Sequence, residues 1–183
     1  SGFLKPRDLA RSSEVLEKTL TYLPFWVISV AATTSYKGVF ERLIPPVMKE
    51  GEIKKKYNWL VLARKATQFP TREYDVPLDG KVSYDFRKIE GFAKVLNSEM
   101  EKRDAVELTR QQIESHHRFL AQQDVDKIIE MNTDARIGEA VYLHAPIWRI
   151  VYEYEGVRYQ VLFDGATGMV IKGDIPAAKL GLL

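Results

Sequence analysis

The sequence predicts an α+β fold in which an antiparallel sheet carries helices largely on one face. Three observations predict this class. Tight, glycine-containing turns separate alternating segments in the last third of the chain, and a long charged segment with helical apolar spacing fills the middle. In addition, two aromatic segments, 22–29 and 144–151, share the pattern proline–apolar–tryptophan–any–isoleucine. Together these features predict two related units, each a helix followed by antiparallel strands.

The N-terminal third predicts a helix and two strands. Apolar residues recur at helical spacing over 6–20, which predicts the first helix. Aromatic and β-branched residues predict a strand over 22–36. After a proline-broken connection, "KKKYNWLVLARKAT" at 54–67 predicts a second strand. Alternation along that strand places four side chains on one face: Tyr57, Trp59, Val61 and Ala63.

The middle of the chain predicts a linker followed by helices. Proline and glycine punctuate 71–85, which we interpret as the linker. From 86 to 131 the spacing predicts three helices, the last beginning at Asp124 as its N-cap. The second helix is heavily charged, with a narrow apolar stripe of Met100, Val106, Ile113 and Leu120. The predicted organisation is a first unit over 3–70 and a second over 86–183, which can also form one continuous domain.

The C-terminal third predicts an antiparallel meander. The strands are "EAVYLHAPIWRIVYEYEG", "VRYQVLFD" and "MVIKGD", and alternation in the first places Trp148, Ile150, Tyr152 and Tyr154 on one face. The first two strands meet at Glu155-Gly156, and the last two are joined by "DGATG". We expect Gly165 and Gly168 in this turn to adopt positive φ, which a β-carbon resists.

The two tryptophan segments predict internal duplication. Each leads to a Tyr-x-Gly turn, and the offset is 122 at the tryptophans (148 − 26) and 118 at the glycines (156 − 38). The difference of four residues indicates two related units with different loops rather than a strict array. The alternative is chance, because aromatic strands that begin with proline are common.

The same residues carry a family resemblance. "YLPFWVI…YKG" and "APIWRIVYEYEGVRYQVLFDGATGMVIKGDIP" resemble a group of poorly characterised microbial proteins that begin with a zinc ribbon and end with membrane-spanning segments. The similarity covers 4–38 and 143–176. The C-terminal segment also looks like PepSY and cystatin-like modules, in which a helix packs on a sheet with a similar last hairpin. The resemblance implies that a ribbon and a membrane anchor lie outside this chain, and it implies no activity.

Composition restricts the classes of function. The 183 residues include 27 basic and 25 acidic side chains, and a net charge of +2 does not by itself indicate a nucleic-acid-binding protein. The chain has no cysteine, which excludes disulfides and thiolate metal sites. This composition is typical of a reducing compartment and favours the cytoplasm or the cytoplasmic face of a membrane. Ser1-Gly2 looks like a cloning remnant, and with the apolar ending "KLGLL" it suggests an excised fragment.

No motif predicts catalysis, a metal or a cofactor. The histidines are His116, His117 and His144. The adjacent pair projects about 100° apart on a helix and cannot chelate one metal as an i, i+4 pair can, so we interpret both as solvated. His144 aligns with Tyr22 in the repeat, which favours aromatic packing. Asp164 and Asp174 flank a hairpin and could share a carboxylate site, but turn formation is favoured.

One basic stretch is a candidate binding surface. Lys54, Lys55, Lys56, Arg64 and Lys65 bracket Tyr57 and Trp59. Basic residues interleaved with aromatic ones are typical of surfaces that bind single-stranded nucleic acid, and basic clusters also bind anionic lipid headgroups. The alternative is a strand with charged ends whose aromatic residues belong to the core.

The sequence therefore predicts a non-catalytic binding or regulatory module of a larger protein, which can be membrane-attached. The expected partner is a protein, contacted through the long charged helix or an exposed sheet face. The alternative is binding to nucleic acid or an anionic membrane surface through the stretch Lys54–Lys65. No cofactor is expected.

Overall fold

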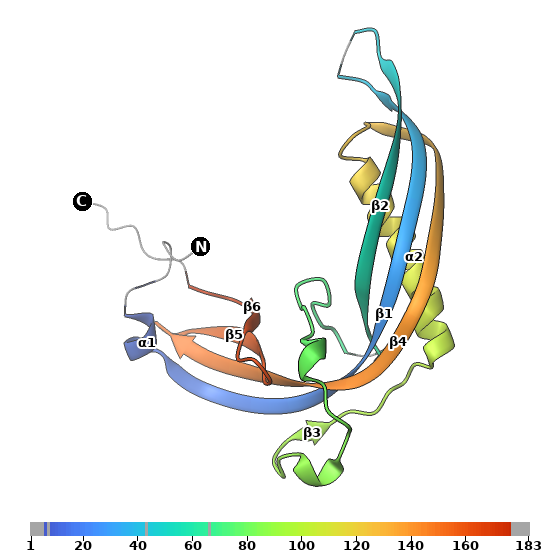
Figure 1. Ribbon diagram of the computed structural model, residues 1–183. Helices are drawn as coiled ribbons and strands as arrows, with labels where there is room; N and C mark the ends of the chain where they lie inside the picture. The colour runs from blue at the N-terminus through green and yellow to red at the C-terminus, as the bar shows by residue number, and fades with distance from the viewer. Residues whose placement is uncertain (1–5, 7, 43, 66, 177–183) are drawn as a thin grey trace, which may run out of the picture. The chain divides into compact units, whose positions relative to one another are not determined.

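The computed structural model describes residues 6, 8–42, 44–65 and 67–176. The predictions for Ser1-Gly2 and for "KLGLL" lie outside these residues. The described chain forms a mainly antiparallel six-stranded sheet with two α-helices (Figure 1), which confirms the α+β class.

The strands pair in the order β2-β1-β4-β5-β6, and β3 pairs with β1 away from this path. Their bounds are β1 Glu14–Phe40, β2 Val47–Leu62, β3 Lys94–Val95, β4 Lys127–Tyr154, β5 Val157–Asp164 and β6 Val170–Gly173. The helices are α1 Leu9–Ser12 and α2 Lys102–Ala121, with short 3₁₀ turns at η1 Leu78–Gly80 and η2 Phe86–Lys88. The strands β1 and β4 are much longer than a usual strand, at 27 and 28 residues.

The chain divides into two compact units. Unit 1 combines Ser1–Pro24, Ala66–Asn97 and His144–Leu183, and unit 2 combines Phe25–Lys65 and Ser98–Leu143. Each unit takes segments from both halves of the predicted division at 71–85. The two long strands contribute to both units. The boundary between the units falls after Pro24 in β1 and after Leu143 in β4.

In unit 2, β1 and β2 form a long antiparallel hairpin that α2 covers on one side (Figure 1). The register runs from Phe25 opposite Leu62 to Phe40 opposite Val47. Alternation along β1 gives one face to α2: Ile28, Val30, Ala32, Thr34 and Tyr36 are all buried. The buried residues of α2 recur every four positions: Ala105, Thr109, Ile113, His117 and Ala121.

Two apolar clusters lie under α2. The larger consists of Ile28, Val30, Ala32, Trp59, Val61, Ala105, Ile113 and Ala135, and the smaller of Tyr36, Ala121 and Val125. Tyr57, Trp59 and Val61 thus share the covered face, as their alternation predicted. Of the predicted helical stripe, Ile113 is fully buried, and Met100 and Val106 pack at the margin of the larger cluster. The buried Thr109 and His117 were not expected.

In unit 1, the C-terminal meander confirms the predicted strands. The end of β4 pairs with β5 from Ile147 opposite Asp164 to Tyr154 opposite Val157, and β5 then pairs with β6. Gly168 has φ +72°, as expected. The same expectation for Gly165 is wrong, since its φ is not positive; a β-carbon there would instead lie 2.9 Å from the Pro146 carbonyl oxygen. Close backbone approach therefore explains this glycine.

Three predicted helices are wrong. Among the described residues of 6–20, only Leu9–Ser12 is helical, and the chain is already extended at Glu14. Tertiary pairing overrides the local helical spacing here, because β1 is hydrogen-bonded to β4 and Glu17 forms an ion pair with Arg149 at 2.6 Å. The first helix expected after residue 86 is replaced by η2 and β3, and the last by the turn after α2 and the start of β4.

Asp124 is consequently not an N-cap. Its carboxylate accepts a hydrogen bond from Tyr36 Oη at 2.7 Å and pairs with Lys49. These contacts hold the pKa of Asp124 below its ordinary value, with Lys49 as the larger cause and Tyr36 next.

Candidate binding surface

From Ser29 onward along β1, the face of the unit 2 sheet that points away from α2 carries small and polar side chains, whereas Val27 and Leu60 before that point are buried. We call this surface the open face. Its β1 residues include Ser29, Ala31, Thr33 and Ser35, which alternate with the buried residues beneath α2. On the open face lies a shallow depression of about 470 Å³, whose lining includes Ser29, Ala31, Lys56, Asn58, Arg136 and Gly138.

Long side chains on the two outer strands flank the small residues of β1. Lys56 stands on β2 opposite Ala31, and Arg136 stands on β4. Two strand spacings separate the backbones of β2 and β4, about 10 Å. Lysine and arginine can span that gap from either side over a floor of small residues. Asn58 and Ser29 add polar groups and hydrogen-bond each other at 3.2 Å.

Most charges on the open face are already paired. Ion pairs join Lys37 to Glu50 at 3.1 Å, Lys54 to Glu52 at 2.7 Å, and Arg136 to Asp134 at 3.0 Å. Lys56 has no ion-pair partner among the residues that the structure describes. The depression therefore carries the uncompensated positive charge of Lys56 and, from the other side, the charge of Arg136, which Asp134 partly compensates.

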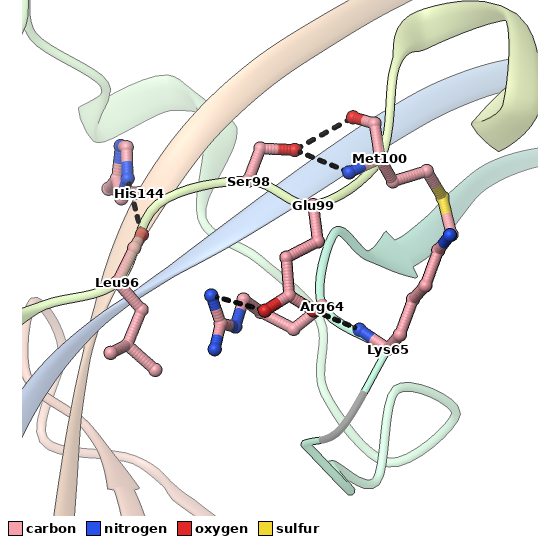
Figure 2. A network of polar contacts seen from close by, with 7 residues as sticks. All are labelled: Arg64, Lys65, Leu96, Ser98, Glu99, Met100 and His144. Atoms are coloured by element: carbon pink, nitrogen blue, oxygen red, sulfur yellow. Dashed lines mark hydrogen bonds and ion pairs between the residues drawn. The ribbon is translucent and has the colours of Figure 1, made fainter.

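The structure distributes the five predicted basic residues over different places. Lys54 and Lys56 lie on the open face, opposite Thr33 and Ala31, whereas Lys55 lies opposite Ala32 on the other face. Arg64 and Lys65 follow the end of β2. Arg64 pairs with Glu99 at 2.7 Å, and the Lys65 backbone N–H donates to the same carboxylate at 2.9 Å. Figure 2 shows both contacts.

The aromatic residues of this stretch turn away from Lys54 and Lys56. The Tyr57 and Trp59 rings meet edge to face at 5.5 Å between centroids, on the side covered by α2. The ring centroids of Trp59 and His116 lie 5.6 Å apart, and Trp59 Nε1 donates a hydrogen bond to Gln112 Oε1 at 2.7 Å. The alternation of β2 thus separates the aromatic residues from the cations with which the sequence interleaves them.

A chain of polar contacts crosses the covered face. His117 is fully buried; its Nδ1 lies 2.7 Å from Thr34 Oγ1 and its Nε2 lies 2.9 Å from Tyr57 Oη. Thr34, also fully buried, contacts Thr133 Oγ1 at 2.8 Å. The interpretation of His117 as a solvated residue is therefore wrong. Its spacing of four residues from Ile113 and from Ala121 directs it at the sheet, although a pattern of apolar residues alone does not include it.

The other candidate residues have structural contacts. His144 packs against Tyr84 at 5.4 Å between centroids, as the aromatic interpretation predicted, and its Nε2 lies 3.0 Å from the Leu96 carbonyl oxygen (Figure 2). Asp164 forms the predicted turn by accepting from the Ala166 N–H at 2.7 Å, and it also accepts from Tyr74 Oη at 3.1 Å. Within the described residues, no group of three or more histidine or acidic side chains could hold a metal ion.

No family model, no curated protein and no solved structure matches the chain. Among the described residues, the structure contains no helix with the length and apolar character needed to cross a membrane.

Proposed function

We propose that this chain is a non-catalytic binding module that contacts a protein partner through the open face of unit 2. The observation that carries the proposal is the depression with Lys56 at its side. An antiparallel sheet commonly exposes one polar face, so exposure alone would mean little. Here the exposed face is hollowed, and it presents a cation without an ion-pair partner among the described residues.

The balance of charges favours an acidic protein segment as the partner. The open face carries four cations named above, and three of them already have carboxylate partners: Lys37, Lys54 and Arg136. A nucleic-acid backbone carries a charge on every nucleotide and gains affinity from each phosphate that a cation neutralises. One uncompensated lysine offers little to such a chain, whereas a segment with one or two carboxylates matches it.

Binding of nucleic acid or an anionic membrane surface is the second candidate. Lys54, Lys55 and Lys56 are consecutive exposed residues on β2, which lies at the edge of the sheet, and this observation favours it. The position of Tyr57 and Trp59 under α2 removes base stacking from this mechanism. Consecutive lysines on an edge strand also protect it against pairing with other chains.

A charge reversal on the open face tests the protein-binding proposal. The probe is a fluorescent glutamate-rich peptide, and the readout is anisotropy at low salt. We expect Lys56→Glu to weaken binding at least about tenfold, equivalent to roughly 1.4 kcal/mol. Lys81→Glu makes the same change in net charge at an exposed loop residue of unit 1 and should leave the affinity within about twofold.

The same assay separates the two candidates. Failure of the wild type to bind the peptide, or equal losses in both variants, would contradict the proposed site. Stronger binding to oligothymidylate or to phosphatidylserine vesicles, with affinity falling steeply as salt rises, would favour the second candidate.

We also infer that the two tryptophan hairpins are related. Each long strand leads through a turn into a shorter antiparallel partner, β1 into β2 and β4 into β5, and each carries its tryptophan opposite that partner. The prediction of a turn at residues 36–38 is wrong, because these residues lie within β1 and pair with β2, so the inference is based on the tryptophan hairpins alone. The similarity to zinc-ribbon, membrane-attached microbial proteins and to PepSY and cystatin-like modules belongs to the same proposal. Sequencing the gene on both sides of this segment tests the context: cysteine pairs upstream and apolar spans downstream would support it.

A further inference from the structure

His117 occupies the one position from which a side chain of α2 reaches the sheet between the two apolar clusters. On the helix it follows Ile113 of the larger cluster by four residues and precedes Ala121 of the smaller by four. Through His117 the helix contacts β1 at Thr34 and β2 at Tyr57, and Thr34 continues the chain to Thr133 on β4. All three strands of the unit 2 sheet thus participate in one polar chain.

The contacts of His117 suit a neutral ring. A neutral imidazole has one donor and one acceptor, and a hydroxyl can serve either nitrogen. A protonated ring donates from both nitrogens, so Thr34 and Tyr57 would both have to accept. Thr34 could then donate onward to Thr133, but the positive charge would remain in a site fully shielded from water.

The neighbouring charged groups do not compensate that charge. On α2 the adjacent titratable group is His116, and on β2 it is Lys55, and both are basic. Tyr57 also faces the ring from β2, and burial raises its pKa. The described residues of β1 and β4 that touch this chain, Thr34 and Thr133, supply hydroxyls only.

Nearby carboxylates are already engaged. Glu114 pairs with Arg118 on the exposed side of α2 at 3.6 Å, and Asp124 binds Lys49 and Tyr36. Burial, then His116, then Lys55 lower the pKa of His117 below its ordinary 6.5. The docked helix therefore binds a proton less readily than the released helix does.

We propose that His117 is a pH-sensitive latch, which holds α2 on the unit 2 sheet near neutral pH and releases it in mild acid. The direction follows from linkage: a histidine with a lowered pKa in the docked form stabilises docking above 6.5, and this contribution is lost as the pH falls below 6.5. Release would expose the apolar clusters beneath α2. The inference does not depend on the proposed binding face.

Hydrogen exchange tests the latch in the intact chain. Protection of a peptide within α2 is compared at about pH 7.5 and about pH 5.5, after correction for the intrinsic pH dependence of amide exchange, and a β5 peptide is the internal reference. In the wild type, α2 should lose up to about tenfold protection per pH unit below 6.5, while β5 stays constant. His117→Gln should abolish this loss, because glutamine does not titrate. The comparison variant His116→Gln leaves the burial of His117 unchanged but removes the next-largest cause of its lowered pKa, so it should reduce the loss without abolishing it.

A second variant keeps the test decisive if His117→Gln does not fold. Lys55→Glu places a carboxylate where a cation now acts on His117, so it should reduce the acid-induced loss of protection. The latch is refuted if α2 protection in the wild type is the same at both pH values. It is equally refuted if His117→Gln or Lys55→Glu loses as much protection as the wild type.

Discussion

The two faces of the unit 2 sheet are built from neighbouring residues of the same strands, yet they differ in almost every physical property. Under α2, β1 presents Ile28, Val30 and Ala32, all at most 3% exposed. One residue away in each case, the open face presents Ser29, Ala31 and Thr33. The covered face is mainly apolar, with the polar chain through His117 in its middle and charged residues at its edge, and the open face from Ser29 onward is polar, hollowed and nearly balanced in charge. Strand alternation thus allows one short sequence to specify a buried stabilising face and an exposed polar face.

The largest expected effect lies in the middle of the covered face. Ile113 is fully buried in the larger apolar cluster. Replacing it with alanine removes buried methyl groups and leaves a cavity, so we expect a loss of about 2–5 kcal/mol in the free energy of unfolding. Glu107→Ala on the exposed side of α2 should change it by less than about 0.5 kcal/mol. Urea unfolding of both variants checks the contrast, and similar losses would contradict the assignment of the covered face.

Two glycines extend the comparison to the space available on each face. A β-carbon at Gly38 would lie 2.6 Å from both Val125 Cγ2 and the Lys127 carbonyl oxygen, whereas one at Gly138 would lie 3.4 Å from Ser29 Cβ. Gly38→Ala should therefore destabilise by about 1–3 kcal/mol through overpacking. Gly138→Ala should be neutral or slightly stabilising, by at most about 1 kcal/mol. Thermal unfolding of both variants measures the difference. A larger loss of stability for Gly138→Ala than for Gly38→Ala would contradict the assignment of the two faces.

A smaller effect is expected at the edge of the covered face, where Asp124 binds Lys49 and Tyr36. These contacts lower the pKa of Asp124, so its contribution is present above 3.8 and is lost as the pH falls through the lower, folded value. Asp124→Asn should cost roughly 0.5–1 kcal/mol near neutral pH, since the pair is partly exposed to solvent. The difference from wild type should shrink below about pH 4. A difference that is independent of pH would show that the carboxylate charge contributes nothing.

The elements that the sequence predicted correctly have local signals. Glu155-Gly156 and "DGATG" define two turns of the C-terminal meander, and the alternation of 54–67 assigns Tyr57 and Trp59 to the core face. The segment 6–20 gave a false helix because its apolar residues recur at roughly helical spacing, whereas pairing with β4 decides in favour of the strand. Long-range pairing of this kind leaves no signal within a window of a few residues.

The open face and the chain through His117 were harder to predict. The stretch of lysines is evident in the sequence, but the concavity depends on Ser29, Ala31 and Gly138, which come from two strands far apart in sequence. Arg136 was not predicted for the same reason. The sequence holds one signal for His117, its spacing of four from Ile113 and from Ala121, but a pattern of apolar residues does not include a histidine.

Adjacent threonines on β1 provide the most direct test of the central claim that alternation separates the two faces. Thr34 is fully buried and contacts His117 Nδ1 at 2.7 Å, whereas its neighbour Thr33 is on the open face. Valine has nearly the shape of threonine, so the measurement is the free energy of unfolding of Thr34→Val and Thr33→Val in urea. We predict a loss of about 1–3 kcal/mol for Thr34→Val, because buried polar partners lose a hydrogen bond, and a change within about 0.5 kcal/mol for Thr33→Val. Equal losses at the two positions, or a larger loss at Thr33, would contradict the account.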